Sequence, residues 1–86
     1  MKEEINLISD TITRPTPEML ACMLQAEVGD DVFNSDPTVK KLQQKIASLF
    51  GMEAALFFPS GTMANQTAIK LHTQPAEQLI CDKWSH

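Results

Sequence analysis

The stretch Phe57-Phe58-Pro59-Ser60-Gly61-Thr62-Met63-Ala64-Asn65 says most about how this chain folds. In it, an apolar run passes through a proline into a turn of small residues that opens a helix. Ser60 is a favourable N-cap residue, and the first amides of a helix have no acceptor inside that helix. These amides and the positive end of the helix dipole attract anions. The turn therefore predicts either a plain helix cap or a phosphate site, and the pattern alone leaves both open.

The same turn lacks the sequence marks of two common nucleotide sites. No Gly-Lys-Ser/Thr follows it, as a P-loop would require, and no further glycine follows Gly61, as a dinucleotide fingerprint would require. Nucleoside triphosphates and NAD are therefore disfavoured. A cofactor with a single phosphate is the favoured ligand.

Two apolar segments flank the helix expected over residues 61–72. Ala54–Phe58 is an uninterrupted apolar run, which is typical of a strand covered on both faces in a parallel sheet. Gln78–Asp82 is a second expected strand, and Ile5–Ile8 is a short extended segment at the other end of the chain. Strand, crossover helix and strand together predict one β-α-β unit of an α/β fold.

Two further helices are expected before this unit. Thr16 and Pro17 provide a cap and a first helical residue for a helix that runs to about Ala26. Asp36-Pro37 repeats this start signal, and Gly51 provides a stop. Between them, apolar residues recur at helical spacing at Val39, Leu42, Ile46, Leu49 and Phe50.

Composition narrows the possible partners. The chain has 86 residues, a formal net charge of −4 and no cluster of Lys or Arg. Neither nucleic acid nor an anionic membrane surface is therefore an expected partner. No apolar run approaches the roughly 18 residues that span a bilayer, and Met-Lys-Glu-Glu is too acidic to open a secretion signal. We expect a cytoplasmic protein with an aliphatic, Met-rich core.

Several side chains are candidates for other roles. His86 follows the second expected strand and would emerge at the same sheet edge as Ser60, either solvated or able to stack on a flat cofactor and move a proton. Ser9-Asp10-Thr11 predicts either a ligand-facing loop or a capped turn. Cys22 and Cys81 are expected to be free, buried thiols. Asp30, Asp31 and Asp36 form a short cluster of acids. No metal site is expected there, because Asp36 already has a capping role and the spacing matches no known calcium loop.

Five blocks of this sequence resemble, in order, the amino-terminal part of low-specificity L-threonine aldolases. The resemblance extends over essentially the whole chain and about the first quarter of a typical family subunit. The blocks are Asn6–Thr16, Val28–Phe33, Asp36–Val39, Glu53–Phe57 and Pro59–Gln66.

The resemblance implies a fold-type I pyridoxal phosphate enzyme of the aspartate aminotransferase superfamily. Such an enzyme cleaves L-threonine or L-allo-threonine to glycine and acetaldehyde, and it assembles as a homodimer or homotetramer. By resemblance, Ser60, Gly61 and Thr62 hold the cofactor phosphate. His86 stacks on the pyridine ring and handles the hydroxyl proton, and Ser9 lies near the substrate carboxylate.

The resemblance also implies that residues 1–86 form an incomplete part of the large domain. A parallel sheet needs several strands, and one β-α-β unit supplies only two of them. In the family, the lysine that binds the cofactor covalently lies beyond the matched region. No lysine here lies in a matching motif: Lys2, Lys40, Lys41, Lys45, Lys70 and Lys83. We therefore expect an apparently truncated domain that is inactive by itself.

Two departures from the family and two alternative functions accompany this interpretation. Many members have Arg at the position of Ile8 and Tyr-Gly at the position of Phe33-Asn34, which leaves a polar contact and the oligomer contacts open.

The first alternative function is that of a noncatalytic remnant, or pseudogene product, that binds a phosphorylated ligand. The second is a helical interaction fragment that offers the apolar faces of residues 19–24 and 39–50 to a partner.

Overall fold

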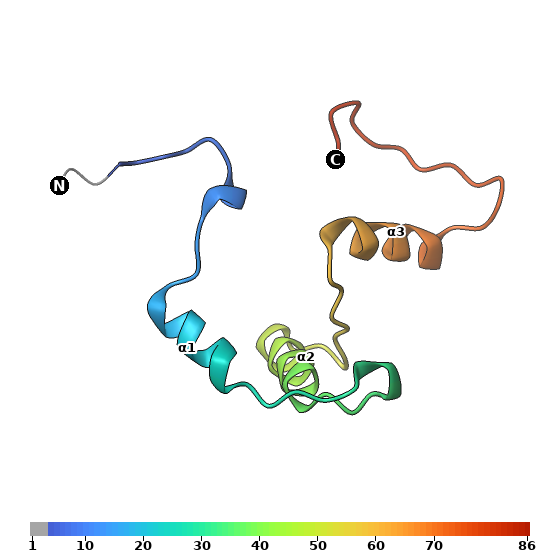
Figure 1. The fold of residues 1–86 in the computed structure, drawn as a ribbon. Helices are drawn as coiled ribbons and strands as arrows, with labels where there is room; N and C mark the ends of the chain where they lie inside the picture. The colour runs from blue at the N-terminus through green and yellow to red at the C-terminus, as the bar shows by residue number, and fades with distance from the viewer. Residues whose placement is uncertain (1–3) are drawn as a thin grey trace. The chain divides into compact units, whose positions relative to one another are not determined.

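The computed structural model describes residues 4–86, and its regular elements are all helical (Figure 1). The chain divides into two compact units, with the boundary between Leu42 and Gln43. In chain order the elements are the 3₁₀ helix η1 (Asp10–Ile12), the α-helix α1 (Pro17–Gln25), the 3₁₀ helix η2 (Asp31–Phe33), and the α-helices α2 (Pro37–Phe50) and α3 (Gly61–His72).

The three predicted α-helices are confirmed, and their start signals act as expected. At α1, the Thr16 hydroxyl oxygen accepts a hydrogen bond from the Met19 amide at 3.3 Å, and Pro17 occupies the first helical position. At α2, the Asp36 carboxylate accepts from the amides of Thr38 and Val39 at 3.0 and 2.9 Å. Each side chain satisfies amides that the helix itself leaves without an acceptor.

Helix α2 ends where the sequence predicts. Gly51 has a φ of 63°, in the left-handed region, and the Met52 amide donates to the Ala47 carbonyl at 2.9 Å. This is the geometry of a glycine C-cap, in which the chain turns off the helix and satisfies one of its last carbonyls. Glycine has no Cβ, so it adopts this conformation without the steric cost that other residues incur.

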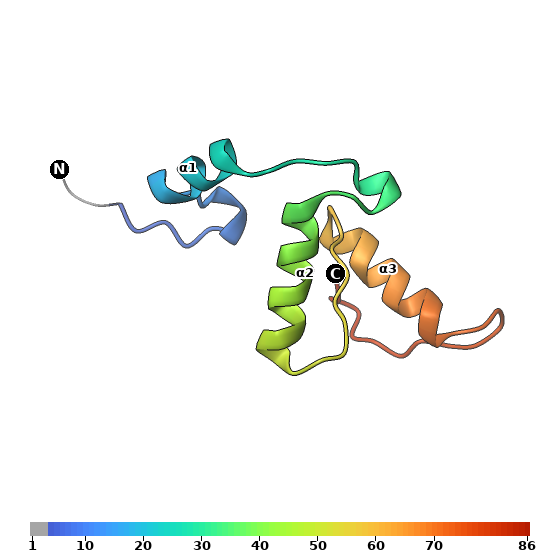
Figure 2. The same ribbon diagram turned by 90° about the horizontal axis from the view of Figure 1, so that it is seen from below.

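The predicted strands are not formed. Residues 4–86 contain no strand, and Ile5–Ile8, Ala54–Phe58 and Gln78–Asp82 are irregular segments (Figure 2). A strand is defined by a hydrogen-bonded neighbour, and two strands joined by one crossover helix are seldom stable without further strands and covering layers. The Phe57 amide instead donates to the Gln43 side-chain oxygen at 2.9 Å. The expected β-α-β unit is therefore absent, although its helix is present.

The expected apolar core is also absent from residues 4–86. Every described residue is exposed or partly exposed, and the apolar faces of the helices lie open. Cys22 and Cys81 are free, as expected, but both are exposed, so the prediction that they are buried is wrong. Among the described residues, no helix has the length and apolarity needed to cross a membrane.

Replacing Gly51 with alanine is expected to shorten α2. The left-handed conformation costs a residue with a Cβ about 1 kcal/mol or more, so the last turn of the helix should fray. Far-UV circular dichroism should show reduced helicity, and amide exchange should accelerate near Ser48. The matched control is Gly61→Ala, because Gly61 has no positive φ and a Cβ there meets nothing within 4 Å. Equal helicity in the two variants would contradict the C-cap assignment.

Candidate functional site

A groove of about 480 Å³ lies in the second unit, between α3 and the segment that follows it. The chain leaves α3, turns back along it and brings its last residues toward the start of the helix (Figures 1 and 2). Helix α3 contributes Thr62, Asn65, Gln66 and Ile69, which share one face because they are spaced by three and four residues. The returning segment contributes Cys81 and His86 among others.

The first turn of α3 has the geometry of a capped helix. The Ser60 hydroxyl oxygen accepts from the Met63 amide at 3.2 Å, and the Ser60 carbonyl accepts from the Ala64 amide at 3.2 Å. The amides of Gly61 and Thr62 precede these two and have no acceptor within the helix. The predicted cap is therefore confirmed at Ser60, and the amides of Gly61 and Thr62 have no acceptor within the helix.

Further donors lie beside these amides. Ser60 accepts with its oxygen, so its own hydroxyl proton is free to donate elsewhere, as is that of Thr62. A Cβ at Gly61 would meet open space, so nothing in the chain blocks the approach of a ligand to this backbone. Two amides and two hydroxyls at a helix start suit the oxygens of one phosphate group.

His86 shares the groove with Thr62, whereas the prediction placed it beside Ser60 at the edge of a parallel sheet. The described residues form no sheet, and the returning segment carries His86 to the start of α3. Ser60 and Gly61 lie next to Thr62 in the chain and do not line the groove themselves. Asn65 and Gln66 were missed in the sequence, although their spacing from Thr62 is a signal that was available.

Ser9 lies in the first unit and has a local role there. Its hydroxyl oxygen accepts from the Thr11 amide at 3.2 Å and lies 2.9 Å from the Thr11 hydroxyl oxygen, so Ser9 caps η1. The capped-turn alternative therefore describes this segment. Asp36 and Asp30 likewise act as caps, of α2 and η2, and the described residues contain no cluster of acids, His and Cys suited to a metal ion.

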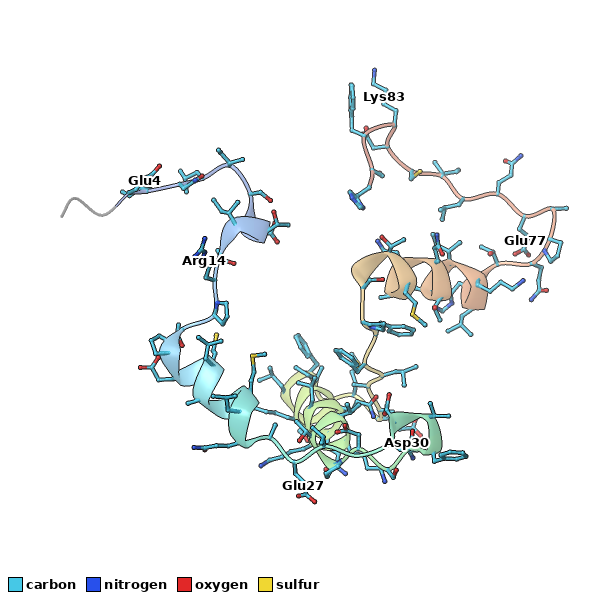
Figure 3. The ribbon with its side chains drawn as sticks, in the orientation of Figure 1. Glu4, Arg14, Glu27, Asp30, Glu77 and Lys83 are labelled. Carbon is cyan, nitrogen blue, oxygen red and sulfur yellow. The ribbon has the colours of Figure 1, made fainter. Side chains whose placement is uncertain are left out.

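None of the described residues that line the groove is a Lys, Arg, Asp or Glu. Lys83 is close in sequence, but its Nζ lies 5.2 Å from the centroid of the Trp84 ring, in a cation–π contact outside the groove lining (Figure 3). Anion binding here therefore depends on amides, hydroxyls and the helix dipole. No lysine amine lines the groove to bond a carbonyl covalently.

Comparison with known proteins identifies the family. The family model described as "Beta-eliminating lyase" matches residues 6–86. The chain is 49% identical over 82 residues to the low specificity L-threonine aldolase of Escherichia coli strain K12, a match that covers 95% of this chain and 25% of that protein. It is also 50% identical over 68 residues to low-specificity L-threonine aldolase 1 of Arabidopsis thaliana, covering 79% of this chain and 19% of that protein.

A yeast relative gives the same result. The low specificity L-threonine aldolase of Saccharomyces cerevisiae is 44% identical over 82 residues, covering 94% of this chain and 21% of that protein. The chain belongs to the beta-eliminating lyase family, a family of fold-type I pyridoxal phosphate enzymes. It spans about a fifth to a quarter of the length of these threonine aldolases.

Inorganic phosphate is expected to bind at the start of α3 at lower concentrations than those at which it perturbs other helix starts. In an isotope-labelled sample, phosphate should shift the Gly61 and Thr62 amide resonances and the His86 ring resonances. Ser60→Ala should weaken the effect, because loss of a cap destabilises the first turn by about 1 kcal/mol. The start of α1 is the internal control, and sodium chloride at the same ionic strength is the solvent control. Equal shifts at α1 and α3 would contradict a specific site.

Proposed function

We propose that this chain forms the amino-terminal segment of a pyridoxal phosphate-dependent aldolase subunit that cleaves L-threonine or L-allo-threonine to glycine and acetaldehyde. The observation that carries the proposal is the 49% identity over 82 residues to a named threonine aldolase. Residues 1–86 would then be part of an α/β large domain. Its sheet would form once further strands pair with residues 54–58 and 78–82.

The donors at the start of α3 fit the phosphate of this cofactor. The amides of Gly61 and Thr62, together with the hydroxyls of Ser60 and Thr62, would hold the phosphate oxygens. When bound, pyridoxal phosphate withdraws electrons from the substrate's α-carbon, which makes a bond to that carbon easier to break. The rest of the groove would accommodate the flat ring, because its wall is apolar where Ile69 and Leu79 line it.

His86 is the proposed catalytic residue of this segment. Its imidazole shares the groove with Thr62, so a ring held by its phosphate at the helix start would lie within reach of stacking. A neutral imidazole nitrogen has a lone pair that can accept the proton of the substrate hydroxyl. By resemblance to the family, Ser9 is proposed to contact the substrate carboxylate.

Two features support the proposal that this chain alone is inactive. No lysine lines the groove, so the covalent anchor of the cofactor has to come from another part of the subunit. No described residue is buried, so the helices have no core of their own to hold the site in place. The remaining part of an aldolase subunit would cover these apolar faces. We propose that the complete enzyme is a cytoplasmic homodimer or homotetramer in threonine breakdown and glycine formation.

A noncatalytic role is the second candidate, and the same groove favours it. A site with free amides and no lysine can bind a phosphorylated small molecule without transforming it. The two candidates differ in one respect. The aldolase segment acquires activity when the missing part of the subunit is supplied, whereas a phosphate-binding remnant does not.

Complementation is expected to restore activity. The chain should be co-expressed with the part of the Escherichia coli aldolase that lies beyond the matched region, and glycine formation from threonine should be measured. Activity is expected only when both polypeptides are present, together with the absorbance of lysine-bound cofactor. Glycine formation by the chain alone would contradict the proposal that the chain is inactive without the rest of the subunit. Inactivity of a folded complex would favour the phosphate-binding remnant.

Site substitutions in the complemented enzyme are expected to separate binding from catalysis. His86→Asn should lower kcat about a hundredfold or more, as expected for loss of a proton-transfer group, with cofactor content retained. Thr62→Val removes one phosphate donor and should mainly lower cofactor retention during dialysis. Thr73→Val is a matched control, because Thr73 follows α3 outside the groove lining and donates to the Ile69 carbonyl. Unchanged kinetics and cofactor content in both site variants would overturn these assignments.

A further inference from the structure

The segment between α1 and α2 has several hydrogen bonds between residues five or more apart, although none of residues 4–86 is buried. Glu27 and Asp30, both labelled in Figure 3, lie along it. The Ser35 amide and the Ser35 hydroxyl both donate to the Asp30 carbonyl, at 2.9 and 2.7 Å. The Thr38 hydroxyl donates to the Glu27 carbonyl at 2.5 Å, which joins the first turn of α2 to the residue two positions after α1. We refer to residues 27–39 as the interhelix clamp.

Asp36 lies at the centre of the interhelix clamp because its two carboxylate oxygens have different partners. Oδ1 accepts from the Thr38 and Val39 amides and so caps α2. Oδ2 accepts from the Gly29 amide at 3.2 Å, seven residues earlier in the chain. Hydrogen bonds from the amides of Val39, Gly29 and Thr38 hold the pKa of Asp36 below its ordinary value.

Gly29 is required because the chain at residue 29 crosses close to the chain at residue 35. A Cβ at position 29 would lie 2.3 Å from the Ser35 carbonyl oxygen and 2.9 Å from the Ser35 carbonyl carbon. Both atoms belong to the backbone, so a larger residue forces the loop apart. Because the same approach brings the Gly29 amide to Asp36, a side chain here would also pull the carboxylate's second partner away.

We infer that Asp36 couples the start of α2 to the crossing at Gly29, so that the interhelix clamp orders as one cooperative unit without a surrounding core. Asp36 is thus a positioning residue for the tip of the loop. The tip carries Val32 and Phe33, whose side chains are 87% and 80% exposed. The inference does not depend on the proposed aldolase activity, because it concerns hydrogen bonds within residues 27–39 alone.

The alternative is that Asp36 is only a helix cap, and two variants distinguish these roles. Asp36→Ser keeps one oxygen that can cap α2 but cannot also reach Gly29. Gly29→Ala leaves the cap residue in place and disrupts the crossing. Asp31→Ser is the matched control, because it removes the same charge within the loop and the Asp31 carboxylate accepts none of the hydrogen bonds found in residues 4–86.

Amide hydrogen exchange on the isotope-labelled 86-residue chain tests the coupling. In Asp36→Ser, exchange at Gly29 and Ser35 should accelerate about tenfold, as expected for loss of a hydrogen bond to a charged group, and exchange at Thr38 should accelerate with it because the interhelix clamp opens as one unit. In Gly29→Ala, exchange should accelerate at Ser35 and also at Thr38. The control should match the unmodified chain. The inference is overturned if Gly29→Ala leaves Thr38 protected, if Asp36→Ser leaves Gly29 unchanged, or if Gly29 is unprotected in the unmodified chain.

Discussion

The structure depends on one recurring interaction, in which a side-chain oxygen accepts a hydrogen bond from a backbone amide at the start of a helix. Ser9, Thr16, Asp30, Asp36 and Ser60 all make this bond, at η1, α1, η2, α2 and α3. Each bond joins residues two or three apart in sequence, so it forms without long-range packing. Because none of residues 4–86 is buried, such local bonds contribute most of the side-chain interactions that hold the elements.

The difference between local hydrogen bonds and long-range packing explains which parts of the fold could be predicted from the sequence. Helix starts and stops rest on neighbouring residues, and the signals at Thr16-Pro17, Asp36-Pro37 and Gly51 correspond to observed caps. A strand has its hydrogen-bond partners elsewhere in the chain or in another part of the subunit. The apolar run Ala54–Phe58 carries a real preference for burial in a sheet, but that preference has no effect until neighbouring strands and covering helices are present.

The candidate site divides in a similar way. The turn Ser60-Gly61-Thr62 was predictable, because the residues that cap a helix also set which amides stay free. His86 was expected to share one sheet edge with Ser60, but the groove groups it with Thr62 instead, without a sheet. Asn65 and Gln66 lie one helical turn further along α3, which the Ser60-Gly61-Thr62 pattern does not include. A groove formed between a helix and a returning segment depends on the path of irregular chain, which local sequence patterns specify poorly.

The cap and the free amides at the start of α3 are therefore two consequences of one arrangement. The first three amides of a helix compete for acceptors, and the Ser60 oxygen satisfies the third. The two amides that remain are the ones that point out of the helix start, beside a glycine with open space around it. Because the cap fixes the turn, this donor set can exist before any sheet is assembled. His86 differs in kind, since its place in the groove depends on residues 73–85, and only a paired strand there would hold it firmly.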